Sequence, residues 1–234
     1  MKLTYDFHIH TALSPCGENS MTPNNIVHMA LLCGLDVIAI TDHNTCENVG
    51  AVLEVAKDTE LLVLPGIEVE TREEIHVICL FSSLETVLEL QNVIYQKLPP
   101  LKNKVKIFGE QLVLNAEDEE VGHLERLLTF ATDFSIDDLC KWVLERGGAF
   151  IPAHIDRPSY SVLSNLGIIP DYLGIRTLEI SRHAEYEIYA NKYNEYQVVQ
   201  SSDAHELGYI GICNRQIESK EKSVQSIIDA LNKV

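Results

Sequence analysis

Two histidines near the amino terminus, His8 and His10, are the first residues in this sequence whose type and spacing suggest chemistry. They lie where apolar and polar side chains alternate, which predicts a β-strand with an apolar face made of Leu3, Tyr5, Phe7 and Ile9. Residues two apart on a strand share a face, so both imidazoles project to the same side. Two neutral imidazoles on one face can form half of a metal site. A lone His-x-His is short and common, however, and by itself fits an exposed polar strand face better.

The rest of the chain repeats this chemistry where other predicted strands end. An apolar run over 36–41 is followed by Asp42 and His43, and another over 61–64 leads to Glu68. Later predicted strands, over 75–81, 149–153 and 196–202, contain or deliver further polar side chains, namely His76, His154, Asp203 and His205. The carboxyl ends of parallel strands meet at one rim, where barrel enzymes place their active sites. We therefore expect these residues to converge with His8 and His10.

Helical patterns separate the predicted strands, at about 22–33, 49–57, 84–97, 135–146 and 222–233. This alternation predicts the α/β class with right-handed crossovers between parallel strands. Six or seven such units close more naturally into a barrel than into an open sheet. The alternation weakens over 82–134. We therefore expect a single domain, 1–234, in which 82–134 forms an inserted cap.

Composition excludes some classes of protein. The 234 residues are 46% hydrophobic and carry a formal net charge of −17, which gives no electrostatic basis for binding duplex nucleic acid. No apolar run is long enough to cross a bilayer, and Asp6 stands where a signal peptide needs its apolar core. We therefore expect a cytoplasmic protein with no membrane partner. The six cysteines are dispersed, mostly in apolar segments, which favours free thiols. The oligomeric state stays open.

Taken in order, these motifs resemble those of the PHP superfamily, named for polymerase and histidinol phosphatase. The matching segments are His8-x-His10, Thr41-Asp42-His43-Asn44, Pro65-Gly66-Ile67-Glu68 with His76, Ala153-His154 and Ser202-Asp203-Ala204-His205. The resemblance covers nearly the whole chain apart from 82–134 and points to bacterial stand-alone phosphoesterases that act on nucleotides and short RNA. It implies a distorted TIM-like (β/α)7 barrel that binds two or three divalent metal ions, variously manganese, iron or zinc.

The resemblance also implies a set of metal ligands in this sequence. They are His8, His10, His43, Glu68, His76, His154, Asp203 and His205, and Glu68 is expected to bridge two metals. One position departs from the family pattern. Relatives often have an Asp or a His five or six residues after the second histidine of the first motif, where this chain has Pro15 and Cys16, with Glu18 just beyond. Cys16 would favour zinc and Glu18 manganese, and if neither binds, one metal site is weak or empty.

The expected chemistry is hydrolysis of a phosphate ester by a metal-activated hydroxide. Glu68 and His205 are candidate catalytic residues as well as ligands. Asp42 either donates a proton to the leaving alcohol or orients a metal-bound histidine. Cationic donors to the phosphate are expected in loops that follow the strands at the same rim, namely Arg157, Arg182 and His183.

We expect the substrate to be a phosphomonoester on a small, nucleotide-like molecule, because a charge of −17 repels a long polyanion. Three alternatives stay open. They are a histidinol-phosphate phosphatase, an exoribonuclease that trims short RNA from an end, and a non-catalytic metal-binding PHP module. Loss of ligands would indicate the module, and here eight candidates are present.

Overall fold

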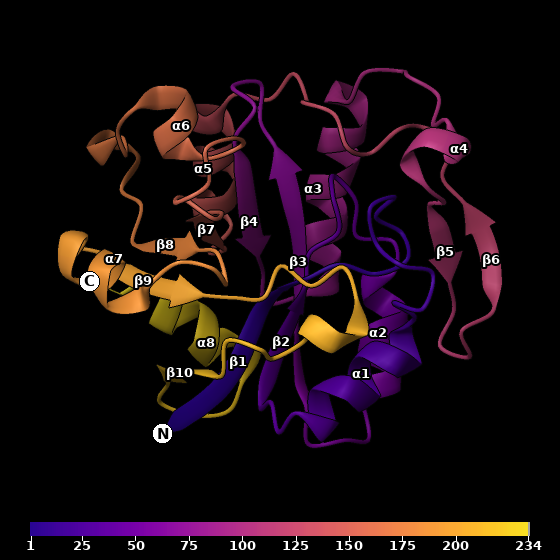
Figure 1. Ribbon diagram of the computed structural model, residues 1–234, viewed down its shortest axis with the longest axis horizontal. Coiled ribbons are helices and arrows are strands. Elements are labelled where there is room, and N and C mark those ends of the chain that lie inside the picture. Colours follow the sequence, from indigo (N-terminus) through magenta and orange to yellow (C-terminus); the bar gives the residue numbers. More distant parts are fainter. Residues whose placement is uncertain (234) are drawn as a thin grey trace.

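The computed structural model describes residues 1–233, and within them six strands form a strongly curled sheet (Figure 1). Its order is β10 (Arg215–Glu218), β1 (Lys2–Ile9), β2 (Val37–Ile40), β3 (Leu62–Glu70), β4 (His76–Leu80) and β7 (Ala149–Pro152). Strands β1, β2 and β3 are parallel, whereas β10 and β4 run antiparallel to their neighbours. The predicted α/β class is confirmed.

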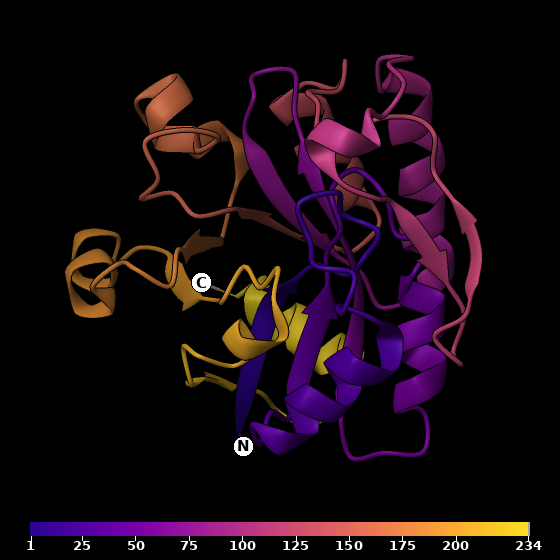
Figure 2. The same ribbon diagram turned by 45° about the vertical axis from the view of Figure 1, so that its right-hand side comes forward.

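A parallel pair, β8 (Thr177–Ile180) and β9 (Gln197–Gln200), continues the curl from β7 back towards β1 (Figure 2). On one side the Ile155 N–H donates to the Glu179 carbonyl at 2.8 Å. On the other side the Ala204 N–H donates to the His8 carbonyl at 3.1 Å, and the His10 N–H donates to the Ala204 carbonyl at 3.0 Å. The arrangement is consistent with the expected distorted barrel.

One part of the topology differs from the expectation of parallel strands throughout. Strands β3 and β4 are antiparallel because residues 71–75 connect them by a tight turn, too short for a crossover helix. The Thr71 N–H donates to the Ile75 carbonyl at 2.9 Å across this turn. The turn places Glu68 and His76 on adjacent strands near one end of the sheet.

The five helices that the sequence predicts are present, and each begins within about two residues of the predicted start. Thr22, Ser83 and Ser135 each accept a hydrogen bond from a backbone N–H in the first turn of the helix that follows. The helices are α1 (Pro23–Leu32), α2 (Val49–Ala56), α3 (Leu84–Lys97), α4 (Val105–Phe108), α5 (Ile136–Glu145), α6 (Val162–Leu166), α7 (Tyr186–Lys192) and α8 (Val224–Leu231), with 3₁₀ turns at Asp171–Leu173 and Leu207–Tyr209. The predicted five are α1, α2, α3, α5 and α8, whereas α4, α6 and α7 are not among them.

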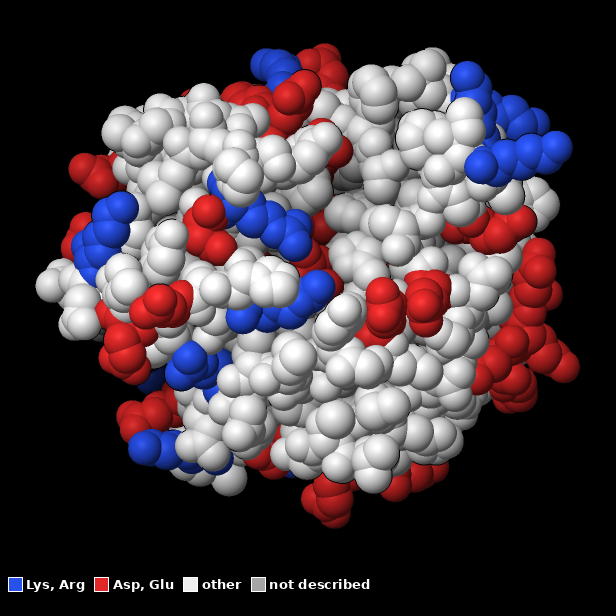
Figure 3. Space-filling view, viewed as in Figure 1, with Lys and Arg blue, Asp and Glu red and all other residues white. Residues whose placement is uncertain are grey.

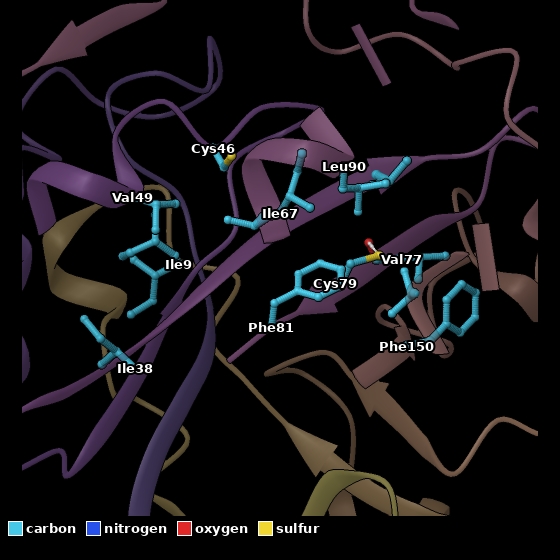
Figure 4. Close-up of a cluster of buried hydrophobic side chains, with 14 of the residues drawn as sticks. Ile9, Ile38, Cys46, Val49, Ile67, Val77, Cys79, Phe81, Leu90 and Phe150 are labelled. Atoms are coloured by element: carbon cyan, nitrogen blue, oxygen red, sulfur yellow. Dashed lines mark hydrogen bonds between the residues drawn. The ribbon is translucent and has the colours of Figure 1, made fainter. Parts of the chain in front are cut away.

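Two apolar cores support the sheet. In one, Leu3, Tyr5 and Phe7 of β1 pack in the same cluster as Ile227 and Leu231 of α8. In the other, sheet residues pack with those of α1, α2, α3 and α5, and Figure 4 shows Ile38, Ile67, Val77, Phe81 and Phe150 of this core. Ile9 belongs to the second core, because the pairing of β1 with β2 shifts register between Asp6 and Ile9. The expected single apolar face of β1 therefore ends at Phe7.

The segment 82–134 consists of two unlike parts. Helix α3 packs through Val87, Leu90 and Ile94 into the second apolar core, which also contains Ile38, Ile67 and Phe150. Residues 98–134, with α4 and the hairpin β5 (Leu112–Leu114)–β6 (Glu120–His123), lie to one side, on the right of Figure 1. The Leu112 N–H donates to the Ala12 carbonyl at 3.0 Å, so this part is fastened to the loop that follows β1.

Candidate metal centre

Glu68 lies at the centre of a group of imidazoles and is buried. Its oxygens lie 2.8–3.4 Å from ring nitrogens of His8, His10, His43, His76 and His154. The shortest of these distances joins Glu68 Oε2 to His43 Nδ1, at 2.8 Å. The structure thus brings together side chains from β1, β3 and β4 and from residues within three positions after the ends of β1, β2 and β7.

Asp203 and His205 approach the same group from the loop after β9. Asp203 Oδ1 lies 3.4 Å from His8 Nε2 and 3.3 Å from His10 Nε2, and the ring of His205 stacks on that of His10 at 4.1 Å. Within the described residues, the possible ligand atoms form three sets, and the atoms of each set lie within 4.8 Å of one another. The sets are His8, His10 and Asp203; His43, Glu68 and His76; and His10, His43 and His205. All eight predicted ligands therefore meet in one place.

Several nitrogen and oxygen atoms of the predicted ligands form no hydrogen bond of suitable geometry with residues 1–233. Both oxygens of Glu68 and both ring nitrogens of His154 are buried without a hydrogen-bond partner among the described residues. Burying such polar groups without partners is costly. Lone pairs of carboxylates and imidazoles directed at common points are instead what divalent manganese, iron or zinc requires. The residues present therefore fit a cluster of divalent metal ions.

The buried carboxylates and imidazoles shift one another's pKa values. Burial lowers the pKa of His8, His43 and His76, but their anionic neighbours outweigh it and raise the pKa, so a bound metal ion would have to displace a proton from these rings. Burial opposes ionisation of Glu68, but the rings of His76, His8 and His43 outweigh it and hold the pKa of its carboxyl well below the ordinary value. His8 and His10 act in the same way on Asp203, whose pKa also lies well below its ordinary value despite burial. Burial lowers the pKa of His154, which favours its neutral, metal-binding form.

Glu179 is a buried residue of the site that sequence reasoning missed. Its carboxylate lies 3.0 Å and 3.2 Å from His8 Nδ1, on the opposite side of the ring from Glu68, and accepts a hydrogen bond from the His154 N–H at 3.1 Å. A carboxylate bonded to the second nitrogen of a metal-binding histidine fixes the orientation and tautomer of the ring. An acidic residue between Leu178 and Ile180 in a buried strand was the signal that could have revealed it.

Asp42 is buried behind the imidazoles. Its carboxylate accepts hydrogen bonds from the Thr11 N–H at 2.7 Å, the Thr11 hydroxyl at 2.8 Å and the Ser14 hydroxyl at 2.7 Å. Ser14 Oγ lies 2.9 Å from His10 Nδ1. Burial raises the pKa of the Asp42 carboxyl, and the three hydrogen bonds counteract that shift. Asp42 therefore contacts a predicted ligand through Ser14.

The two candidates for the variable ligand position lie in different surroundings. Cys16 lies near the imidazoles of His43 and His205, which act on its thiol, although the residue is exposed. Burial of the thiol acts to raise its pKa, but the two imidazoles outweigh burial and lower the pKa of Cys16 to about 6. The Glu18 carboxylate accepts a hydrogen bond from the Ser20 hydroxyl at 3.1 Å, and the residue is exposed. Of the two, Cys16 lies closer to the metal centre.

A cavity of about 310 Å³ opens beside the metal centre. Two cations line it: Arg157, whose Nη2 lies 2.7 Å from Asp203 Oδ2, and Arg182, whose guanidinium stacks over Tyr209. Its other lining residues are His43, Glu68, Glu70, His76, Thr129, Tyr160, Asp203 and His205. His183 is exposed and is not among these lining residues, so the structure places only two of the three expected phosphate donors here.

The backbone at this cavity is strained. Asn44, His154, Tyr160 and Asp203 all have positive φ angles, between 31° and 55°. Such conformations cost free energy in residues other than glycine, and they gather where a site needs a particular side-chain direction. Each of these residues is a predicted ligand, follows one directly or lines the cavity.

Comparison with known proteins identifies the family. A family model described as the PHP domain matches residues 6–234. The chain belongs to the PHP domain family. Its buried clusters of histidines and carboxylates have the composition of divalent metal sites.

Sequence relatives of this PHP domain include bacterial ribonucleases. The 5'-3' exoribonuclease Rnm of Escherichia coli (strain K12) is 27% identical over 162 residues, which are 61% of this chain and 54% of that protein. Rnm of Salmonella typhimurium is 35% identical over 79 residues, 32% of this chain and 26% of that protein. The PHP domain therefore spans about half, or less, of the length of these relatives.

Solved structures share its fold. Endonuclease Q in complex with a 27-mer duplex substrate carrying an abasic lesion aligns with a TM-score of 0.73 and 19% identity, over 99% of this chain and 56% of that one. A putative metal-dependent phosphoesterase from Bifidobacterium adolescentis aligns with a TM-score of 0.59 and 20% identity, over 87% of this chain and 88% of that one.

Within residues 1–233, no helix has both the length and the apolar character needed to cross a bilayer.

Proposed function

We propose that this PHP domain hydrolyses a phosphomonoester on a small, nucleotide-like substrate. The observation that carries the proposal is the position of Glu68, buried among five imidazoles, at the edge of a cavity that also contains two arginines. Divalent metal ions, when bound, lower the pKa of a water molecule and withdraw charge from phosphoryl oxygens. His8, His10, His43, His76, His154, His205, Asp203 and Glu68 would bind two or three such ions, with Glu68 between two of them.

The residues of the chain contribute binding and orientation. Arg157 and Arg182 can each form paired hydrogen bonds with phosphate oxygens. Asp203 accepts a hydrogen bond from Arg157 Nη2, which holds the guanidinium next to the metal centre. Asp42 keeps the ring of His10 in place through Ser14, and this contact favours its orienting role over proton donation.

The surface charge supports a small substrate. Near the middle of the face shown in Figure 3, basic side chains lie with acidic ones beside them, and a further basic group lies at the upper right, where Figure 1 shows α4. Acidic side chains cover the side where Figure 1 shows β5 and β6. With a net charge of −17, a cavity that contains two arginines suits one phosphate better than a long polyanion.

A second candidate is an exoribonuclease that removes nucleotides from the end of short RNA. The sequence relatives described as 5'-3' exoribonucleases favour it. Such an enzyme needs to bind only the terminal nucleotides at the metal centre, so the acidic surface does not oppose it. Histidinol phosphate and a non-catalytic module have less support, because the sequence relatives are described as exoribonucleases and all eight candidate metal ligands lie together.

A substrate panel combined with metal analysis tests these proposals. The purified protein should contain more than one transition metal ion per chain by mass spectrometry and release phosphate from nucleoside monophosphates or bisphosphates. The panel should add histidinol phosphate and short and long 5'-phosphorylated RNA at several salt concentrations. Best activity on long RNA with a steep decrease in binding as salt rises would contradict a small substrate. Bound metal without turnover of any ester would indicate the module.

A further inference from the structure

A second cavity, of about 280 Å³, adjoins the cavity at the metal centre. The two share Glu70, Thr129 and Tyr160 in their walls. Each is close to the lower end of the range, about 300–1,000 Å³, that small-molecule sites occupy. Because the walls are shared, a ligand with its phosphate at the metal centre can extend into the second cavity.

Three aromatic side chains line this second cavity and are open to solvent. Phe108 is 40% exposed, Phe130 44% and Tyr160 47%. Aromatic side chains normally bury most of their surface, and a group of exposed ones around one cavity marks a binding site. Planar π-systems are the natural partners of such side chains, and stacking tolerates every base.

Hydrogen bonds hold the backbones of these aromatic residues in place. The Tyr160 carbonyl accepts from the His76 N–H at 3.0 Å, which attaches this residue to a predicted metal ligand. The Phe130 carbonyl accepts from Asn44 Nδ2 at 3.0 Å, and Asn44 directly follows His43. Gly109, next to Phe108, packs so closely on the Pro15 carbonyl that an added Cβ would lie 2.1 Å from its oxygen. Aromatic positions fixed in advance lose little entropy when a ligand stacks on them.

Charge excludes a second phosphate from this cavity. Its charged lining residues are Glu70 and Glu74, and no lysine or arginine is among the described residues that line it. Carboxylates repel phosphate but accept hydrogen bonds, as do the carbonyls of the cavity wall. The occupant should therefore be planar, uncharged and able to donate.

We propose that the cavity between Phe108, Phe130 and Tyr160 binds the base of a nucleotide whose phosphate lies at the metal centre. A base with an exocyclic amino group fits best, because Glu70 and Glu74 can accept its hydrogen bonds. The inference rests on the proposed function and makes it more specific, since it restricts the ester to a nucleotide or the terminal nucleotide of a short RNA.

Kinetics on paired substrates test the base site. Phe130→Leu and Phe108→Ala should raise KM for adenosine 5'-monophosphate by about 5- to 100-fold, as expected for the loss of one stacked base, and leave KM for ribose 5-phosphate nearly unchanged. Tyr172→Ala, which removes an aromatic residue 75% exposed elsewhere, is the control. Adenosine and cytidine monophosphates should be preferred over those of inosine and uridine, and Glu74→Gln should reduce that preference.

The outcomes separate this inference from the proposed function. If p-nitrophenyl phosphate is hydrolysed while the variants change KM equally for the nucleotide and ribose 5-phosphate, the base site is wrong and the phosphoesterase stands. If no ester is hydrolysed, saturation-transfer NMR with adenosine monophosphate still decides. Binding that weakens in Phe130→Leu but not in Tyr172→Ala supports the site, and binding that is absent or unchanged in Phe130→Leu overturns it.

Discussion

Charged side chains at the two ends of the curled sheet have different partners. At the amino end, Asp36 just before β2 accepts hydrogen bonds from the Thr4 N–H and from Lys222 Nζ, both at 2.9 Å. At the carboxyl end, Glu68 lies among imidazoles, and neither of its oxygens has an aligned hydrogen bond within residues 1–233. Hydrogen bonds from the protein satisfy the Asp36 carboxylate, whereas the Glu68 carboxylate lacks such donors among the described residues and is suited to bound cations. In barrel folds the first end contributes stability and the second contributes function.

Changing Glu68 should give the largest effect and tests the carboxyl end directly. Glu68→Gln removes the charge that would bridge two ions, and we expect kcat to fall by about 10³-fold or more, since this corresponds to several kcal/mol of lost charge stabilisation. Metal content per chain should fall as well, measured by mass spectrometry beside phosphate release. The control is Glu145→Gln at an exposed position of α5. A Glu68→Gln protein with normal metal content and turnover would show that Glu68 does not bridge metals.

Glu179→Gln should have a smaller effect, because Glu179 acts through His8 rather than on a metal. Loss of the carboxylate that orients His8 should weaken metal binding or activity by about 10- to 100-fold. Competition with a chelator measures metal affinity without reference to turnover. Circular dichroism should show the fold retained, since the amide keeps the shape of the side chain. Unchanged affinity would mean that the contact at 3.0 Å does not orient the ring.

Cys16 and Glu18 form a matched pair for the variable ligand position. Because the His43 and His205 imidazoles lower the pKa of Cys16 and so favour its metal-binding thiolate, Cys16→Ser should weaken binding of one ion and reduce any preference for zinc. Glu18→Gln should leave metal content unchanged. The cobalt(II)-loaded protein should show a thiolate charge-transfer band that is lost in Cys16→Ser and kept in Glu18→Gln. A band that survives in Cys16→Ser would exclude Cys16 as a ligand.

The sequence predicted that the eight side chains of the metal centre meet at one place, because each lies in or shortly after an apolar strand, whereas their role as metal ligands follows from the family resemblance. The position of His43, for example, follows from the continuous apolar run that precedes it, which is typical of a buried parallel strand. It did not predict the antiparallel β4, since apolar runs look the same in either direction, nor β10, whose four residues alternate weakly. The aromatic cavity was equally out of reach, because Phe108, Phe130 and Tyr160 come from separate segments that only the tertiary fold brings together.

The smallest effect is expected at the amino end, where Lys222→Met removes the charge next to Asp36 and keeps an apolar stem. The pair is partly exposed, so the free energy of unfolding at pH 7 should fall by less than about 1 kcal/mol, without a change in metal content or turnover.

The pH dependence of this contribution follows from the pKa of Asp36. Burial acts to raise that pKa, but Lys222 and the Thr4 N–H outweigh burial and lower the pKa of Asp36 in the folded protein. A carboxyl whose pKa is lower in the folded state stabilises the protein above its unfolded pKa, about 3.9, and this contribution is lost as pH falls through the folded value. Urea denaturation of both proteins should therefore show a difference at pH 7 that disappears in acid. A loss of turnover in Lys222→Met would mean that the two ends of the sheet are coupled, and the contrast between them would have to be abandoned.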